Sequence, residues 1–128
     1  MPALRISDLA KAGGVGVETV RFYQRRGLLA ARSGTAAAGR NYDAEDLRRL
    51  RYIRRAQAAG FTLAEISELI ALDQTDDRPR AREMARNRIA ALDAEIARLE
   101  EARRSLAKLA SDCARDRAGP CPILAAFD

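Results

Sequence analysis

The stretch from residue 80 to residue 112 constrains the fold most, because its 33 residues include neither glycine nor proline. As a single helix it would be ~50 Å long at 1.5 Å per residue. Its seam positions recur in alternating steps of three and four, the heptad pattern of a coiled coil. These positions are Ile89, Leu92, Ile96, Leu99, Arg103, Leu106, Ala110 and Cys113. One helix cannot bury such a stripe on itself, so we expect a second copy of the chain to cover it; packing on the N-terminal half is the alternative.

The segment from Val17 to Leu29 combines apolar and cationic residues within about three helical turns. Its apolar residues are predicted to pack inward and its polar residues to face solvent. The inward set is Val17, Val20 and part of the Phe22–Tyr23 pair, and the outward set is Glu18, Thr19, Arg21 and Arg25. Gly27 is the predicted end of this helix, with Arg25 and Arg26 beside the negative end of the helix dipole.

A shorter helix is predicted just upstream, with Ser7 as its N-cap and Gly13 and Gly14 as its end. Two short helices joined by a glycine turn form a helix-turn-helix, whose second helix enters the major groove of DNA. Helix–glycine–helix units also occur in proteins that bind no DNA, so this pattern is a hypothesis until other features support it.

The charge of the chain is divided unevenly. Residues 1–60 hold 12 Lys and Arg against 5 Asp and Glu, a net charge of +7, while residues 61–128 hold 11 against 13, a net charge of −2. A basic half beside a mildly acidic half suggests that the first half meets a polyanion such as DNA. A general arginine bias would instead spread the charge evenly.

The composition argues against an enzyme and against a membrane protein. The chain has no histidine for general base chemistry, and its glycines at 13–16 lack the spacing and the lysine of a phosphate loop. It has no apolar run of ~18 residues and no secretory signal, so we expect a cytoplasmic protein with no membrane partner.

Between residues 30 and 66 the sequence predicts a loop or wing followed by two helices. Residues 30–42, rich in Gly, Ser and Ala, form either a small β-wing whose arginines touch DNA or a surface linker. A helix follows from Asp43 or Ala44 to Gly60, and Thr62 with Glu65 forms a capping box for the next helix.

The whole chain is predicted to divide into four regions. They are a DNA-binding domain at 1–72, a linker at 73–79, a dimerisation helix at 80–112 and a metal-binding segment at 113–128. Pro79, at the end of the linker, is expected in the first turn of the dimerisation helix.

The two cysteines, Cys113 and Cys121, lie at the end of the long helix and at the predicted N-cap of a short one. A helix N-terminus favours a thiolate at Cys121. Two thiols cannot supply the four ligands that zinc usually takes, but they suit a soft ion that accepts two ligands, such as Cu(I). Redox sensing and two ordinary thiols are the alternatives.

Three arginines crowd the predicted start of the long helix, where the dipole disfavours cations: Arg78, Arg80 and Arg82. Their placement suggests an anion nearby, such as two thiolates around a monovalent ion. Asp76 and Asp77 could instead neutralise them locally. We assign Arg78 and Arg82 as effector-site charges.

Together these segments resemble the MerR family of bacterial transcription regulators over nearly the whole chain. The resemblance rests on four segments of the sequence: residues 6–11, the highly characteristic residues 17–29, residues 40–42 and residues 60–66. The loop from Cys113 to Cys121, followed by Pro122, Ile123 and Leu124, resembles the metal loop of the metal-sensing branch and is most similar to that of the copper efflux regulators.

The resemblance implies an all-α fold with a small β-wing: a winged helix-turn-helix DNA-binding domain and a long helix that forms an antiparallel coiled-coil homodimer. It implies binding to double-stranded promoter DNA, which the dimer distorts so that RNA polymerase can start transcription. Carried over by position, Arg21, Tyr23 and Arg40 contact DNA, and Cys113 and Cys121 hold the metal. The full set of DNA-binding residues that we predict is Glu18, Thr19, Arg21, Tyr23, Arg40, Tyr42 and Arg54.

The expected effector is Cu(I), Ag(I) or Au(I). Where divalent-metal sensors of the family have a third cysteine, this chain has Arg78, which argues against a three-thiolate site for Hg(II), Zn(II) or Pb(II). A regulator of the same type that responds to Hg(II) or to thiol oxidation is the second expectation.

Overall fold

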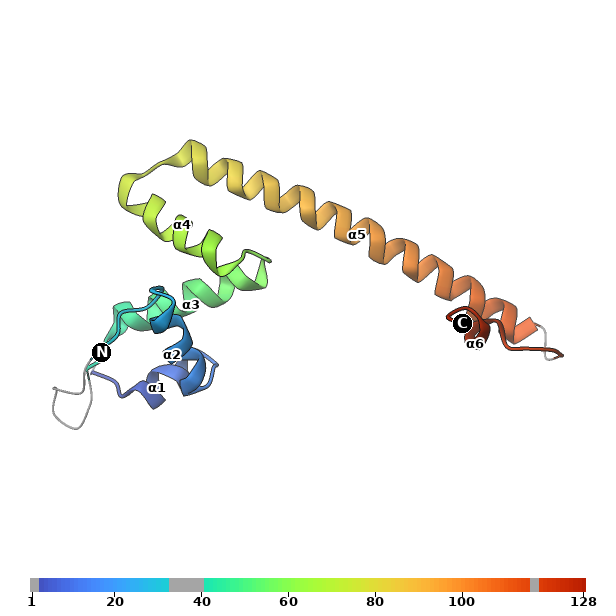
Figure 1. Cartoon of the computed structure of the whole chain (residues 1–128), viewed down its shortest axis with the longest axis horizontal. Helices are drawn as coiled ribbons and strands as arrows, with labels where there is room; N and C mark the ends of the chain where they lie inside the picture. The colour runs from blue at the N-terminus through green and yellow to red at the C-terminus, as the bar shows by residue number, and fades with distance from the viewer. Residues whose placement is uncertain (1–2, 33–40, 116–117) are drawn as a thin grey trace. The chain divides into compact units, whose positions relative to one another are not determined.

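The computed structural model describes residues 3–32, 41–115 and 118–128, and the polypeptide is mainly helical there (Figure 1). The helices are α1 (Ile6–Ala12), α2 (Val17–Arg25), α3 (Ala44–Ala58), α4 (Leu63–Thr75), α5 (Arg78–Arg115) and α6 (Pro122–Ala125). The chain divides into one compact unit at 1–82 and a second at 83–128. The predicted fold class, mainly α with a helix-turn-helix and a long C-terminal helix, is confirmed. Among the described residues, no helix combines the length and apolar character needed to cross a lipid bilayer.

The core of the first unit is built around α3. The largest fully buried side chains are Leu9 of α1, Val20 of α2, Leu50 and Ile53 of α3, and Ile66 of α4. Each such burial contributes roughly 1.5–3 kcal/mol. Four helices therefore share one apolar core, and α2 contributes one of its sides to it.

Glycines make the turns of the helix-turn-helix. α1 ends at Ala12, and Gly14 then adopts a φ of 73°, which glycine tolerates without a steric penalty. Gly27 has a φ of 75° just after α2, as predicted for the end of that helix. The predicted N-cap of α1 is wrong: Arg5 occupies that position, and its backbone N–H donates to the Asp8 carboxylate at 3.3 Å.

The connection from α2 to α3 is anchored at both of its described ends. Leu4 and Tyr42 form an antiparallel bridge, with N–H···O distances of 2.6 and 3.0 Å. Arg32 donates two hydrogen bonds, of 2.9 and 3.0 Å, to the carboxylate of Asp46, which is 6% exposed. The predicted wing at 33–40, including Arg40, lies outside the described residues.

The break between α4 and α5 is shorter than the predicted linker. The capping box of α4 is present, because the Thr62 N–H donates to Glu65 at 2.8 Å and the Glu65 N–H donates to Thr62 at 3.1 Å. α4 then continues to Thr75 and α5 starts at Arg78, so much of the 73–79 segment is helical. Asp76 makes the turn with a φ of 50°.

Helix α5 is longer than expected, with 38 residues from Arg78 to Arg115 (Figure 1). Pro79 lies in its first turn, where the absence of a proline N–H removes no helical hydrogen bond. Its seam is exposed in the single chain: Ile89 is 56% exposed, and Ile96 and Leu99 are 51% exposed. The described residues of the chain therefore leave about half of this apolar stripe open to solvent.

The contact of α1 with α3 predicts the effect of a methyl group at Gly13. A Cβ there would overlap Cδ2 of Leu50 and lie 2.8 Å from its Cγ, and Leu50 is fully buried. We expect Gly13→Ala to lower the free energy of unfolding by about 1–3 kcal/mol, the usual cost of overpacking a core. Thermal and urea denaturation followed by circular dichroism measure this change. The matched control is Gly16→Ala, where the added Cβ meets nothing within 4 Å; equal stability losses in the two variants would contradict the overpacking argument.

Candidate nucleic-acid interface and thiol pair

The outer face of α2 carries the charges that the sequence predicts. Val20 and Tyr23 are buried, whereas Glu18 and Arg21 are exposed and form an ion pair of 3.2 Å between Arg21 Nη1 and Glu18 Oε1. Arg25 is also exposed, and Thr19 is half-buried. The predicted division of this helix into an inner and an outer face is confirmed. The cations of the outer face are free to approach a polyanion.

Hydrogen bonds fix the rotation of α2 about its axis. The Tyr23 hydroxyl donates to Gln57 Oε1 of α3 at 2.6 Å. Gln24 Nε2 donates to the Tyr42 hydroxyl at 2.8 Å and to the Ala30 carbonyl at 3.3 Å. Two consecutive residues of α2 are thus tied to different segments, so the helix cannot turn without breaking these hydrogen bonds, two of which are part-buried.

The remaining residues of the predicted DNA-binding set are placed as follows. Tyr23 is 2% exposed and Tyr42 is 5% exposed, so both rings lie mainly in the core and hold α2 in place. Arg54 is exposed on α3, and Arg40 lies outside the described residues. A DNA contact by each of these four residues stays a prediction.

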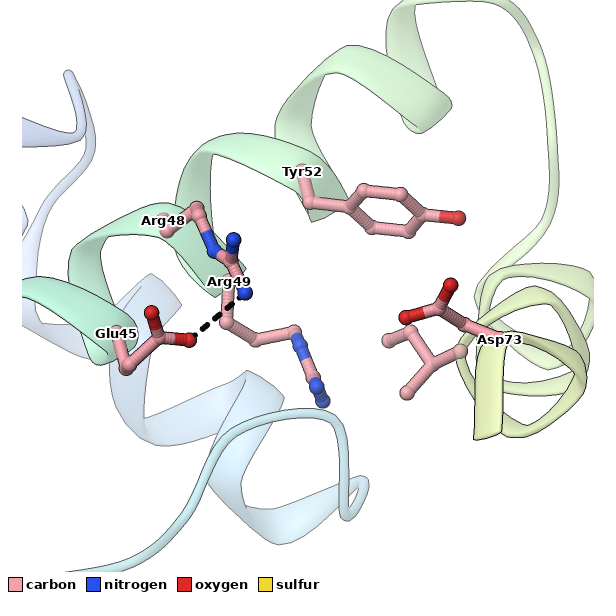
Figure 2. A pocket seen from close by; sticks show the side chains of 6 residues that line it. Glu45, Arg48, Arg49, Tyr52 and Asp73 are labelled. Carbon is pink, nitrogen blue, oxygen red and sulfur yellow. Dashed lines mark hydrogen bonds and ion pairs between the residues drawn. The ribbon is translucent and has the colours of Figure 1, made fainter. Parts of the chain in front are cut away.

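A groove between α3 and α4 was not foreseen from the sequence (Figure 2). It has a volume of about 260 Å³ and is lined by Glu45, Arg48, Arg49, Tyr52, Ile70 and Asp73. Arg48 pairs with Glu45 at 2.9 Å, and burial together with the nearby Asp73 carboxylate raises the pKa of Tyr52. Its lining combines two arginines and a glutamate of α3 with an aspartate of α4, and no sequence motif marks that arrangement.

The two cysteines meet as the sequence predicts. The sulfurs of Cys113 and Cys121 are 3.4 Å apart, and both residues are half-buried. Cys121 is the N-cap of α6, and a hydrogen bond from the backbone N–H of Leu124 lowers its pKa, helped by the Cys113 thiol and the Ile123 N–H. The hydrogen bond to Cys121 raises the pKa of Cys113. Cys121 is thus the thiol of the pair that loses its proton more readily.

This thiol pair can bind a soft metal ion or be oxidised. Both sulfurs come from one chain and are close enough to share an ion after a small rotation of their side chains. In the described part of the chain, no group of three or more His, Cys, Asp or Glu is arranged to hold a metal. A two-sulfur donor set is therefore what residues 83–128 present.

The arginines at the start of α5 are partly neutralised. Arg78 pairs with Asp76 at 3.3 Å, and Arg80 donates to the Glu68 carboxylate at 2.6 and 3.1 Å. Arg82 is exposed. Local carboxylates therefore account for part of this cationic cluster, as the alternative interpretation of the sequence anticipated.

Comparisons with known proteins place these features in a family. Residues 4–72 match the model described as MerR HTH family regulatory protein, and residues 47–109 match the model described as MerR, DNA binding. These matches span both the helix-turn-helix and most of α5.

Individual relatives cover almost the whole chain. The chain is 37% identical to the HTH-type transcriptional regulator HmrR of Sinorhizobium medicae, over 94% of this chain and 84% of that protein. It is 36% identical to the mercuric resistance operon regulatory protein of Serratia marcescens, over 97% of this chain and 87% of that protein. Among solved structures, the chain is similar to the transcription regulator PbrR691 of Ralstonia metallidurans in complex with lead(II). The TM-score is 0.69 and the sequence identity is 33%, over 98% of this chain and 99% of that one.

These relatives are transcription regulators rather than enzymes, and they share this chain's helix-turn-helix and long helix. The chain belongs to the MerR family of DNA-binding helix-turn-helix transcription regulators.

Proposed function

We propose that this regulator responds to Cu(I), Ag(I) or Au(I), which it binds through Cys113 and Cys121, and that metal binding activates transcription by distorting promoter DNA. The observation that carries the proposal is the 3.4 Å separation of the two sulfurs at the N-terminus of α6. Monovalent ions of this group are soft and accept two thiolate ligands. The relatives named as mercuric and lead-bound regulators support a metal effector.

The asymmetry of the two pKa values supports binding of a soft ion by this pair. The lowered pKa of Cys121 makes it the easier of the two thiols to deprotonate, and the thiolate is the form that binds metal. Cys113, whose pKa is raised, then loses its proton as the ion replaces the hydrogen bond between the sulfurs. Two thiolates around a monovalent ion leave one negative charge. Within one chain, nearly the whole length of α5 separates Arg78 and Arg82 from the cysteines. We therefore propose that the same two arginines of a second copy, antiparallel in the dimer, contribute to balancing the charge.

Mercury is the second candidate effector. Hg(II) also accepts two thiolates, and the 36% identity to the mercuric resistance regulator favours it. Oxidation of the two thiols to a disulfide is a further response that the same sulfurs allow.

We propose that the working form is a homodimer in which α5 forms an antiparallel coiled coil. The exposed seam of α5 supports this assembly, because its isoleucines and leucines would otherwise remain in water. A dimer would present two α2 helices to a promoter with two half-sites, on which RNA polymerase also binds.

The seam predicts that a charge at Ile96 dissociates the dimer. Ile96 is 51% exposed in the single chain, and a glutamate there would place two charges in the coiled-coil centre. We expect Ile96→Glu to sediment as a monomer in analytical ultracentrifugation at micromolar concentrations. Ala94→Glu adds the same side chain to α5 outside the seam and should remain dimeric. A dimeric Ile96→Glu protein would contradict the proposed interface.

The outer face of α2 predicts that Arg21 contributes directly to DNA affinity. We expect Arg21→Ala to weaken specific binding by about 1–3 kcal/mol if the guanidinium contacts a base by two hydrogen bonds, and by less if it contacts phosphate. Fluorescence anisotropy on a duplex selected by the wild-type protein measures this loss.

The matched control is Arg104→Ala on α5. Arg104 pairs with Glu101 at 3.1 Å across three residues, just as Arg21 pairs with Glu18, and it is similarly exposed. Removing this second pair should leave DNA affinity unchanged. Equal affinities of the wild type and Arg21→Ala would refute the role of this face.

Anaerobic titration tests the metal site. We expect the wild-type chain to bind Cu(I) tightly and both Cys113→Ser and Cys121→Ser to lose that binding, because a single thiolate cannot hold the ion against competing thiols. X-ray absorption on the loaded protein should show two sulfur ligands in a linear arrangement.

Ala114→Ser serves as the control, since it adds a hydroxyl beside Cys113 at an exposed position and leaves both sulfurs in place. Unchanged Cu(I) binding in the cysteine variants would sink the proposed sensor. A response to Hg(II) but not to Cu(I), or a disulfide in the active protein, would establish the corresponding alternative.

A further inference from the structure

Phe22 is an aromatic residue on the charged outer face of α2, and its role is not accounted for by the thiol site or by the predicted DNA-binding set. Its side chain is 37% exposed. Phe22 follows Glu18 by four residues, so the two side chains are neighbours on the same helix face. Arg21 and Arg25 flank it in sequence and are exposed as well. An apolar ring thus lies among the charged groups proposed to enter the groove.

Neighbouring side chains hold the ring of Phe22. The guanidinium carbon of Arg26 lies over the ring, 6.0 Å from its centroid. The centroid of the Tyr23 ring is 6.1 Å away at an interplanar angle of 46°. Tyr23 is itself fixed by its hydrogen bond to Gln57. The ring therefore has a defined orientation, which a side chain that discriminates between ligands requires.

The major groove presents one apolar group that such a ring can recognise. Thymine is the base whose major-groove edge carries a C5-methyl group, and phenylalanine is among the side chains that contact it. A contact with sugar or phosphate would carry no sequence information. Insertion of a ring between base pairs is typical of minor-groove proteins, whereas the second helix of a helix-turn-helix enters the major groove.

We propose that Phe22 is a specificity-determining residue that reads the C5-methyl group of a thymine in each half-site of the operator. The inference rests on the proposed function of α2 as the helix in the major groove. It adds a residue and a base identity that the charged side chains alone do not provide. Glu18 and Arg21 read hydrogen-bonding groups, and Phe22 reads a methyl group beside them.

The experiment compares thymine with deoxyuridine, which lacks only the methyl group. A duplex is first selected from a randomised library by the wild-type protein, and each dT of one half-site is then replaced in turn by dU. We expect wild-type affinity to fall about fourfold at the contacted position, the value of one buried methyl-sized group. Phe22→Ala should bind the dT and dU duplexes equally, and Phe22→Leu should retain part of the preference.

Tyr52→Ala is the matched control. Tyr52 is 42% exposed on α3, so its removal also deletes an exposed aromatic ring from the first unit, and the preference for dT should persist. Circular dichroism melting of each variant checks that the fold is kept. A dT preference that is unchanged in Phe22→Ala, or a wild-type protein indifferent to dU at every position, would overturn the inference.

The outcomes also separate this inference from the function on which it rests. If Arg21→Ala weakens binding to the selected duplex but dU has no effect, the inference about Phe22 fails and the role of α2 stands. If no duplex is selected, or Arg21→Ala has no effect, the proposed role of α2 fails and the inference fails with it.

Discussion

The burial of Val20 and Tyr23 in the core of the first unit is the constraint on which the proposed DNA-binding surface depends. Both side chains are essentially inaccessible to water, and the Tyr23 hydroxyl is satisfied by Gln57 within the protein. Burying one side of α2 leaves its opposite side to solvent, and that side carries Glu18 and Arg21. Since an unsatisfied buried hydroxyl is costly, the Tyr23–Gln57 bond also fixes which residues face outward. The charges proposed to contact DNA are therefore positioned by an apolar contact.

The fold was predictable where a local rule coincides with a global one. The steps of three and four in α5, and the glycine after α2, both follow from backbone and side-chain geometry that neighbouring residues determine. The N-cap of α1 was not predictable in this way. Ser7 has the residue type that N-caps prefer, yet the N-cap is Arg5, two residues earlier. The end of α4 was missed for a related reason: polar residues at 73–75 suggest a loop, but they extend an exposed helix turn at little cost.

The site was predictable in part. The spacing of Cys113 and Cys121 around a glycine and a proline suggested that the sulfurs meet, and they lie within hydrogen-bonding distance. What the sequence could not show was the asymmetry of the pair, because it arises from the backbone N–H of Leu124 on the side of Cys121 alone. The groove at Tyr52 was invisible for the same kind of reason, since Asp73 reaches it from another helix. Interactions between distant elements leave no local pattern.

The connection between α4 and α5 combines an exposed ion pair with a left-handed residue. Arg80 and Glu68 join the two helices by a pair of charge-assisted hydrogen bonds, and both side chains are 39% exposed. Solvent screens such pairs, so each contributes at most about 1 kcal/mol. Between the helices, Asp76 holds a left-handed conformation that an aspartate adopts less readily than a glycine. Met84, one helical turn after Arg80 on α5, is 4% exposed, so apolar burial contributes here beside the ion pair. Because solvent screens the Arg80–Glu68 pair but not the burial of an apolar side chain, the start of α5 depends more on Met84 than on this pair.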